Sequence, residues 1–330
     1  IDGSPDYCQE VKKLLFGDTN SILSENTLVT VQSLGGTGAL RVGAEMLKTF
    51  SPNSTIAISD PSWENHRSIF ESVGLKVVTY PYYDNSKKKI KHTEFLEKLI
   101  TLPEQSTIIL HACCHNPTGL DLKNSQWNEV LSVIEEKNHI PFLDIAYQGF
   151  KDGIDEDAEI IRRFVSRIRP TFVASSFSKS LSLYGERVGA LSIATNSNSE
   201  SEKVLSHLKK IVRSNYSNPP TYGQYLVTEV LTDKNARIQW NEELNTMRNR
   251  IKATRVALVE LLKDNSKSRD FSFITSQNGM FSFSGLNEIE VTKLRNDFGI
   301  YIVNSGRICI AAINENNIDY VASSISSVID

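Results

Sequence analysis

Residues 106–145 read STIILHACCHNPTGLDLKNSQWNEVLSVIEEKNHIPFLDI, and the expected architecture follows from this stretch. Its two ends, STIIL and IPFLDI, are short and mostly apolar, which is typical of strands buried on both faces of a sheet. Between them, apolar residues recur at the spacing of one helix face, at Trp127, Val130, Leu131 and Ile134. The stretch therefore predicts a strand, a helix and a second strand in a parallel sheet.

The same alternation continues along the chain. Further apolar runs at 55–60, 75–80, 171–177 and 188–194 predict strands, separated by helical patterns. The sequence thus predicts an α/β fold with a mostly parallel central sheet flanked by helices.

The pattern changes beyond a long helical segment near residue 246. Strand-like FSFITS, MFSFSG, YIVNSG and RICIAAI alternate there with a helix near 288–298 and a final helix. We expect a large domain over 1–246 and a smaller α+β domain over 247–330.

Composition excludes several classes of protein. The 330 residues are 40% hydrophobic and 23% charged, with a formal net charge of -3, so the chain is expected to be globular and to bind neither nucleic acid nor membranes. Two of the four cysteines are adjacent, which favours a reduced, cytoplasmic compartment. The chain opens IDGSPDY without an initiator methionine, which suggests a processed or truncated product; a targeting peptide would lie upstream, so an organellar form stays open.

Ligands of open α/β sheets bind outside the carboxyl ends of the strands, so polar residues there are candidates. The first group is SLGGTGALRVGAEML, residues 33–47, where Gly36 and Thr37 precede an amphipathic helix. Backbone N–H groups at such a helix start can hold a phosphate. A plain turn and the glycine turn of a nicotinamide-dependent reductase are the alternatives, although G-x-G-x-x-G spacing is not met.

Two further strand ends carry candidates. In HACCHNPTGL, residues 111–120, adjacent cysteines lack the spacing of a zinc site, whereas the NPTG turn leaves the Asn116 amide free to bind a ligand. In IPFLDIAYQGF, residues 140–150, Asp144 either caps the next helix or meets a cation such as a protonated ring nitrogen, and Tyr147 could point the same way.

The last candidate stretch is SSFSKSLSLYGERVGAL, residues 175–191. Lys179 ends an apolar run, where shelter disfavours the ammonium form and leaves an amine able to attack a carbonyl. Ser176, Ser178 and Arg187 could bind a phosphate. An amine for an aldehyde, a carboxylate for a ring nitrogen, donors for a phenolate oxygen and a phosphate cradle are together complementary to pyridoxal phosphate.

On these motifs, with DPSWENH, RSNYSNPP and SGRICIA, the chain resembles the aspartate aminotransferases among the class I, fold-type I pyridoxal-phosphate enzymes along its whole length. The resemblance implies that Lys179 forms the internal aldimine and carries the proton, that Asp144 pairs with the pyridine nitrogen, and that Asn116 and Tyr147 bind the 3′ oxygen. Trp63 would stack on the ring. The implied phosphate ligands are Gly36, Thr37, Ser176, Ser178 and Arg187.

The resemblance also implies the substrates. Arg307 would bind the α-carboxylate, and Arg213 from the neighbouring subunit of a homodimer would bind the distal carboxylate. Phe281 would line the pocket or pack in the core, and His66 and His111 would support Asp144 or pack in the core. The implied reaction exchanges amino groups between L-aspartate and 2-oxoglutarate, giving oxaloacetate and L-glutamate.

The chain departs from the family pattern after the lysine and at its start, and Ala311 and Ala312 follow RICI where the family usually has a glycine. Ser180, Leu181 and Ser182 replace the usual residues after the lysine, and the N-terminal segment that precedes IDG in the family is absent, from which we expect weaker turnover. A nicotinamide-dependent oxidoreductase and a non-catalytic protein with this fold are the alternatives.

Overall fold

A computed structural model describes residues 1–265 and 269–329. At its centre is a seven-stranded sheet with strand order β1-β9-β8-β7-β6-β2-β3. The bounds are β1 (Leu28–Leu34), β2 (Thr55–Asp60), β3 (Lys76–Pro81), β6 (Thr107–His111), β7 (Ile140–Ile145), β8 (Thr171–Ser176) and β9 (Val188–Ala194). The β3-β2-β6-β7-β8 pairs are parallel, and β9 runs antiparallel to both β8 and β1. The predicted α/β class with a mostly parallel sheet is confirmed.

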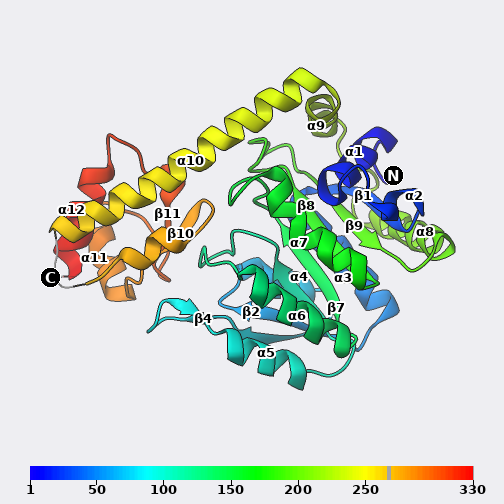
Figure 1. Ribbon diagram of the computed structural model, residues 1–330, viewed down its shortest axis with the longest axis horizontal. Coiled ribbons are helices and arrows are strands. Elements are labelled where there is room, and N and C mark those ends of the chain that lie inside the picture. The colour runs from blue at the N-terminus through cyan, green and yellow to red at the C-terminus, as the bar shows by residue number, and fades with distance from the viewer. Residues whose placement is uncertain (266–268, 330) are drawn as a thin grey trace.

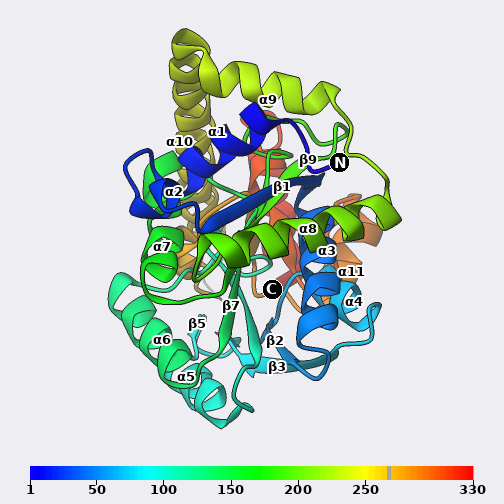
Figure 2. The same cartoon turned by 90° about the vertical axis from the view of Figure 1, so that its right-hand side faces the viewer.

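Helices cover both faces of the sheet (Figures 1 and 2). On one face, α3 (Gly35–Phe50) packs on β8, β9 and β1, with α4 (Glu64–Glu71) and α8 (Asn198–Asn215) beside it. The other face carries α1 (Pro5–Phe16), α5 (His92–Thr101), α6 (Asn124–Glu136) and α7 (Ile154–Arg167). Each face buries its own apolar cluster, so the strands are apolar on both sides as expected.

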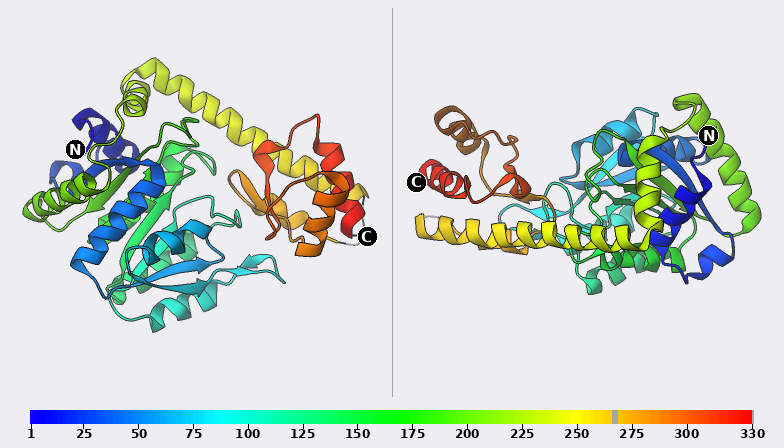
Figure 3. Two further views of the ribbon diagram at one scale, coloured as in Figure 1. Left: turned by 180° about the vertical axis from the view of Figure 1, so that it is seen from behind. Right: turned by 90° about the horizontal axis from the view of Figure 1, so that it is seen from above.

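The long helix α10 (Lys234–Asn265) follows α9 (Tyr222–Thr232) and runs from the sheet to a second, smaller body (Figures 1 and 3). That body contains β10 (Phe281–Phe283), α11 (Glu288–Phe298), β11 (Arg307–Cys309) and α12 (Ile318–Ile329). Residue 246 lies inside α10, and we keep 1–246 and 247–330 as a proposed division. The remaining short elements are α2 (Ser21–Ser24), β4 (Tyr83–Asp84) and β5 (Lys89–Ile90).

Three strand expectations in the small body were wrong wholly or in part. FSFITS contains the 3₁₀ segment Ser272–Ser276, because Phe271 and Ile274 are buried at a helical spacing and Asp270 accepts from the Ser272 N–H at 2.8 Å. YIVNSG is not a strand, since Tyr301 is 80% exposed and pairing begins only at Arg307. RICIAAI forms a strand only at Arg307–Cys309 and then turns into the 3₁₀ segment Ile310–Ala312.

The glycine-rich motif also differs from the expected turn. Gly35, Gly36 and Thr37 form the first turn of α3 rather than a loop before it. Among the described residues, none of the helices is long and apolar enough to cross a membrane.

Candidate active site

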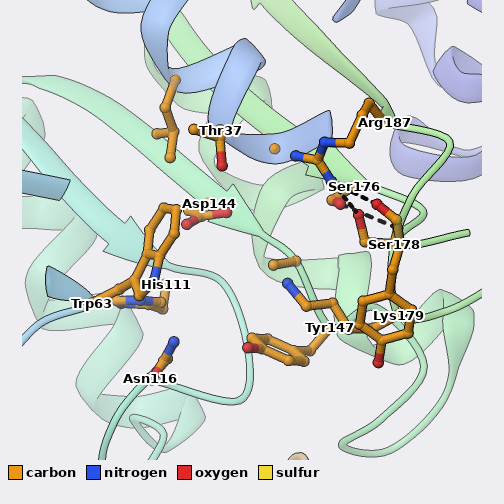
Figure 4. A pocket seen from close by; sticks show the side chains of 14 residues that line it. Thr37, Trp63, His111, Asn116, Asp144, Tyr147, Ser176, Ser178, Lys179 and Arg187 are labelled. Atoms are coloured by element: carbon orange, nitrogen blue, oxygen red, sulfur yellow. Dashed lines mark hydrogen bonds between the residues drawn. The ribbon is translucent and has the colours of Figure 1, made fainter. Parts of the chain in front are cut away.

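A cavity of about 240 Å³ opens at the carboxyl ends of β6, β7 and β8, beside the first turn of α3 (Figure 4). Its lining residues are Gly36, Thr37, Leu40, Trp63, His111, Asn116, Asp144, Ala146, Tyr147, Ser176, Ser178, Lys179, Tyr184 and Arg187. The cavity therefore brings together polar residues from each of the four stretches singled out in the sequence.

Lys179 follows β8 and presents its amine to this cavity (Figure 4). Its Nζ lies over the Tyr147 ring, 4.8 Å from the ring centroid. Burial lowers the pKa of this amine below its ordinary value of 10.5; Asp144 opposes that shift and Arg187 adds to it. The environment thus increases the share of neutral, nucleophilic amine.

Asp144 is a buried carboxylate inside β7, not a helix cap. His66 Nε2 lies 3.0 Å from Asp144 Oδ2, and His66 Nδ1 lies 2.9 Å from Ser62 Oγ. Burial by itself would raise the pKa of Asp144, but the hydrogen bond and charge of His66, with His111 and Lys179, outweigh burial and lower it. The site therefore holds a carboxylate that stays negative at neutral pH.

His111 lies next to this pair without bonding to it. Its ring centroid is 5.0 Å from that of His66, and neither of its nitrogens has a hydrogen-bond partner among the described residues. Burial, reinforced by His66, lowers the pKa of His111 to about 3, so the ring is neutral at pH 7. The expected contact of His111 with Asp144 thus exists as proximity, not as a hydrogen bond.

The other end of the cavity is suited to an anion. Arg187 Nη1 lies 3.4 Å from Ser178 Oγ and 2.9 Å from the Tyr184 carbonyl, while the Ser178 N–H donates to Ser176 Oγ at 3.2 Å. Gly35 has φ +67°, and a Cβ there would lie 2.8 Å from Arg187 Nη2. A helix N-terminus, two hydroxyls and a guanidinium therefore converge.

The small body contributes Arg307 and Phe281. Arg307 Nη1 donates to Asn116 Oδ1 at 2.9 Å, and its guanidinium carbon lies 4.5 Å from the centroid of the Phe281 ring. Phe281 also meets Tyr147, with ring centroids 6.3 Å apart. Phe281 thus packs behind Arg307 and does not line the cavity itself.

Arg213 is not brought to this cavity. It is exposed near the end of α8, where Nη1 donates to Ser217 Oγ at 2.5 Å. Sequence reasoning also missed Ser62 and Tyr184. The DPSWENH motif contains Ser62, which lies just before α4 and four residues before His66, so a hydroxyl close to the histidine could have been expected.

His66, His111 and Asp144 offer ligand atoms within 4.8 Å of one another, as a metal site would. We do not propose one, because both His66 nitrogens already have partners.

The residues fit pyridoxal phosphate, the cofactor indicated by the sequence. Lys179 offers an amine to its aldehyde and Asp144 a carboxylate to its ring nitrogen. Because Gly35 has no Cβ, Arg187 Nη2 can lie close to the first turn of α3, and the guanidinium and the helix N-terminus can face one phosphate together. Fold and site together define an α/β protein whose cavity combines a lysine amine with an end suited to an anion.

The chain belongs to a known family within that class. Residues 1–325 match the family model of aminotransferase class I and II. It is therefore an aminotransferase of the fold-type I, pyridoxal-phosphate-dependent class, an enzyme that acts on amino and keto acids. The family favours this function over the nicotinamide-dependent oxidoreductase considered above.

Individual relatives differ in their names. The chain is similar to an aspartate aminotransferase of Pseudomonas aeruginosa, with 51% identity over 100% of this chain and 83% of the relative. It is 44% identical to an aromatic-amino-acid aminotransferase of Escherichia coli K12, over 99% of this chain and 83% of that one.

A solved structure is similarly close. The aromatic-amino-acid aminotransferase of Burkholderia pseudomallei, covalently bound to pyridoxal phosphate, has a TM-score of 0.98 and 51% identity, covering 100% of this chain and 83% of that one. These relatives show the family and the fold, while their names divide between aspartate and aromatic amino acids.

Proposed function

We propose that the chain transfers the amino group of L-aspartate to 2-oxoglutarate in a ping-pong reaction, giving oxaloacetate and L-glutamate. The observation that carries the proposal is the shared cavity of Lys179 and Asp144, with Arg307 bonded to Asn116 at its edge. An amine, a fixed negative charge and a carboxylate-binding guanidinium are the groups that amino-group exchange requires.

Pyridoxal phosphate, when bound, supplies a carbonyl and a ring that withdraws electrons from the substrate. Its phosphate would be held by the first turn of α3 at Gly36 and Thr37 with Ser176, Ser178 and Arg187. Asp144 would hold a proton on the ring nitrogen, and His66 would keep that carboxylate in place. Asn116 and Tyr147 would donate to the 3′ oxygen, with Trp63 against the ring.

Lys179 is the proposed nucleophile and proton carrier. Because burial lowers the pKa of its amine, a larger share of Nζ lacks its third proton, and this neutral form could take the α-proton of the amino acid. The same nitrogen would return that proton at a different carbon.

Substrate selection would depend on two arginines. Arg307 would bind the α-carboxylate as a bidentate pair, with its guanidinium plane held against Phe281. Arg213 is exposed and outside the cavity of its own chain, so we assign it to the site of a second copy, where it would bind the distal carboxylate. The functional unit would then be a homodimer with shared active sites.

Aromatic amino acids are a second candidate substrate class. The E. coli and Burkholderia relatives carry that name, and the aromatic side chains of Trp63 and Tyr147 at the cavity would accommodate a ring. A cytoplasmic location is proposed from the cysteines, since Cys8, Cys113, Cys114 and Cys309 are all free thiols.

Borohydride reduction of the protein with added pyridoxal phosphate, followed by peptide mapping, tests the site. A pyridoxyl group on Lys179 is expected, with no labelling of that peptide in Lys179→Ala. Steady-state assays with L-aspartate and L-phenylalanine test the reaction. Labelling without turnover of either amino acid would favour the non-catalytic alternative, and no labelling of Lys179 would reject the site.

A further inference from the structure

Arg255 is a buried arginine of α10 that the proposed reaction does not use. Its side chain is 2% exposed. The guanidinium donates to Ser282 Oγ at 3.1 Å through Nε, and to the carbonyls of Gly279 and Phe281 through Nη2. Arg255 therefore binds one short segment, Gly279–Ser282, along its length.

This segment connects the small body to the cavity edge. Gly279 has φ +81°, and a Cβ there would lie 2.6 Å from Cys114 Cβ, so the segment lies directly against the HACCHNPTG loop. The Asn278 N–H donates to the Gly119 carbonyl at 2.6 Å, and Asn278 Nδ2 donates to Asp121 at 3.1 Å. The segment is thus held by the large body on one side and by Arg255 on the other.

The same segment contains Phe281, whose ring centroid lies 4.5 Å from the guanidinium carbon of Arg307. Phe283, further along β10, pairs with Arg307 in the strand register. Any shift of the Gly279–Phe281 backbone would therefore change the ring against which Arg307 is held.

The chemistry of these contacts favours a positioning role. A buried cation is costly unless it donates hydrogen bonds, and here Nε and Nη2 donate to a hydroxyl and two backbone carbonyls. Burial lowers the pKa of Arg255 to about 10, and Cys114 and Asp121 oppose that shift, so the side chain is charged at neutral pH. Charge-assisted hydrogen bonds to carbonyls are stronger than neutral ones and resist backbone movement.

We infer that Arg255 is a positioning residue of the amino-acid subsite, which sets Arg307 through the Gly279–Phe281 segment. The inference rests on the proposed function, because it assigns Arg307 to the substrate α-carboxylate. It concerns the binding of the amino acid and not that of the cofactor, since Arg255 does not line the cavity.

The test replaces Arg255 by Met, which keeps the length and removes the donors, and by Lys, which keeps the charge and loses the planar fork. In the cofactor-loaded protein, Arg255→Met should raise KM for L-aspartate by about 10-fold or more while kcat changes by less than about 3-fold. The dissociation constant of the cofactor should stay within about 2-fold of the parent value. The KM of Arg255→Lys for L-aspartate should lie between those of the parent and Arg255→Met.

Arg250 supplies the matched control. It lies on the same helix and donates to the carbonyls of Ile313 and Ala311 at 3.1 and 2.9 Å, but not to the segment that carries Phe281. Arg250→Met should therefore leave KM for L-aspartate within about 2-fold of the parent value.

A double-mutant cycle tests the route. If Arg255 acts through Phe281, adding Arg255→Met to Phe281→Ala should raise KM by less than about 2-fold, because the ring that contacts Arg307 is already absent. Equal KM values for Arg255→Met and the parent would overturn the inference. It would also be overturned if Arg255→Met raised KM equally in the parent and in Phe281→Ala, or if it weakened cofactor binding as much as substrate binding. Should the Met variant not fold, an unchanged KM in Arg255→Lys would overturn it. If the parent protein shows no transamination, it is the proposed function that fails.

Discussion

His66 Nε2 lies 3.0 Å from Asp144 Oδ2, and both side chains are buried where β7 ends beneath the cavity. Because Nε2 faces a carboxylate, this nitrogen carries a proton in the neutral as well as the charged ring, and Nδ1 faces Ser62 Oγ at 2.9 Å. The imidazole thus keeps a buried negative charge satisfied at the point where the proposed reaction needs one.

Replacing His66 by Leu should lower the free energy of unfolding by about 1–3 kcal/mol at pH 7, because Asp144 loses its partner inside the protein. The native pKa of Asp144 is lowered, so its contribution to stability is complete above its ordinary value of 3.8 and is lost as pH falls through the native value. The difference in free energy of unfolding between parent and variant, measured by urea unfolding, should therefore become smaller at acid pH.

His92 provides a comparison, since its Nε2 lies 3.2 Å from an exposed Glu129. His92→Leu should cost less than about 1 kcal/mol at pH 7. Equal losses for the two variants would contradict the burial argument.

The second prediction concerns the unbonded histidine. Burial lowers the native pKa of His111 to about 3, whereas an unfolded histidine titrates near 6.5. Below pH 6.5 His111 therefore binds a proton in the unfolded chain but not in the native protein. This difference should lower the free energy of unfolding by about 1.4 kcal/mol for each pH unit.

His111→Phe removes that titration while keeping a ring of similar size. The free energy of unfolding of the cofactor-free protein is measured by denaturant unfolding between pH 7 and 5. It should fall less steeply with falling pH for the variant than for the parent. An unchanged slope would mean that His111 titrates normally in the native state.

The glycines near the anion end make a matched pair. Gly35→Ala introduces a Cβ at φ +67° and 2.8 Å from Arg187 Nη2, so the arginine must move. We expect a loss of about 1–2 kcal/mol of stability and a rise of at least about tenfold in the dissociation constant of pyridoxal phosphate.

A Cβ at Gly185 would meet nothing within 4 Å. Gly185→Ala should therefore change stability by less than about 0.5 kcal/mol and leave cofactor affinity unaltered. Equilibrium dialysis measures the cofactor affinity of both variants, and thermal unfolding measures their stability. Equal cofactor affinities for Gly35→Ala and Gly185→Ala would exclude the proposed phosphate site.

The last prediction addresses specificity. Arg213→Asp should reduce kcat/KM for L-aspartate by about 100-fold or more, because the distal carboxylate would face a negative charge. The kcat/KM for L-phenylalanine should change by less than about 3-fold. Lys210 lies exposed on the same helix, and Lys210→Asp serves as the charge control. Equal losses on both amino acids would remove Arg213 from the proposed role.

Mixing experiments would test whether Arg213 acts across the proposed dimer. Heterodimers of Lys179→Ala and Arg213→Asp chains should contain one site with both residues intact, and should regain part of the activity on L-aspartate. Absence of any recovery, with heterodimers demonstrated, would contradict assignment to a second copy.

Much of the large body could be predicted from the sequence. The runs at 55–60 and 188–194 coincide with β2 and β9, because strands buried on both faces leave a continuous apolar signal. The small body was harder: Phe271 and Ile274 are buried at a helical spacing within a β-rich composition, and only three residues of each strand pair there. Short segments carry too little periodicity to separate the two structures.

The same division applies to the site. Lys179, Asp144 and Asn116 stood out in the sequence because a polar residue at the end of an apolar run has no packing reason to be there. Ser62 and Arg255 did not stand out, since a serine before a helix and an arginine in a helix are ordinary.

The sequence by itself determined which chemical groups lie at the carboxyl ends of the strands and the class of ligand that they complement. Only the tertiary structure decided their pairing: His66 with Asp144, Arg307 with Asn116, and Arg255 with the segment that carries Phe281. Local periodicity depends on which face of an element is buried, whereas these contacts depend on strand order and on the packing of α10, which are set by interactions between distant parts of the chain.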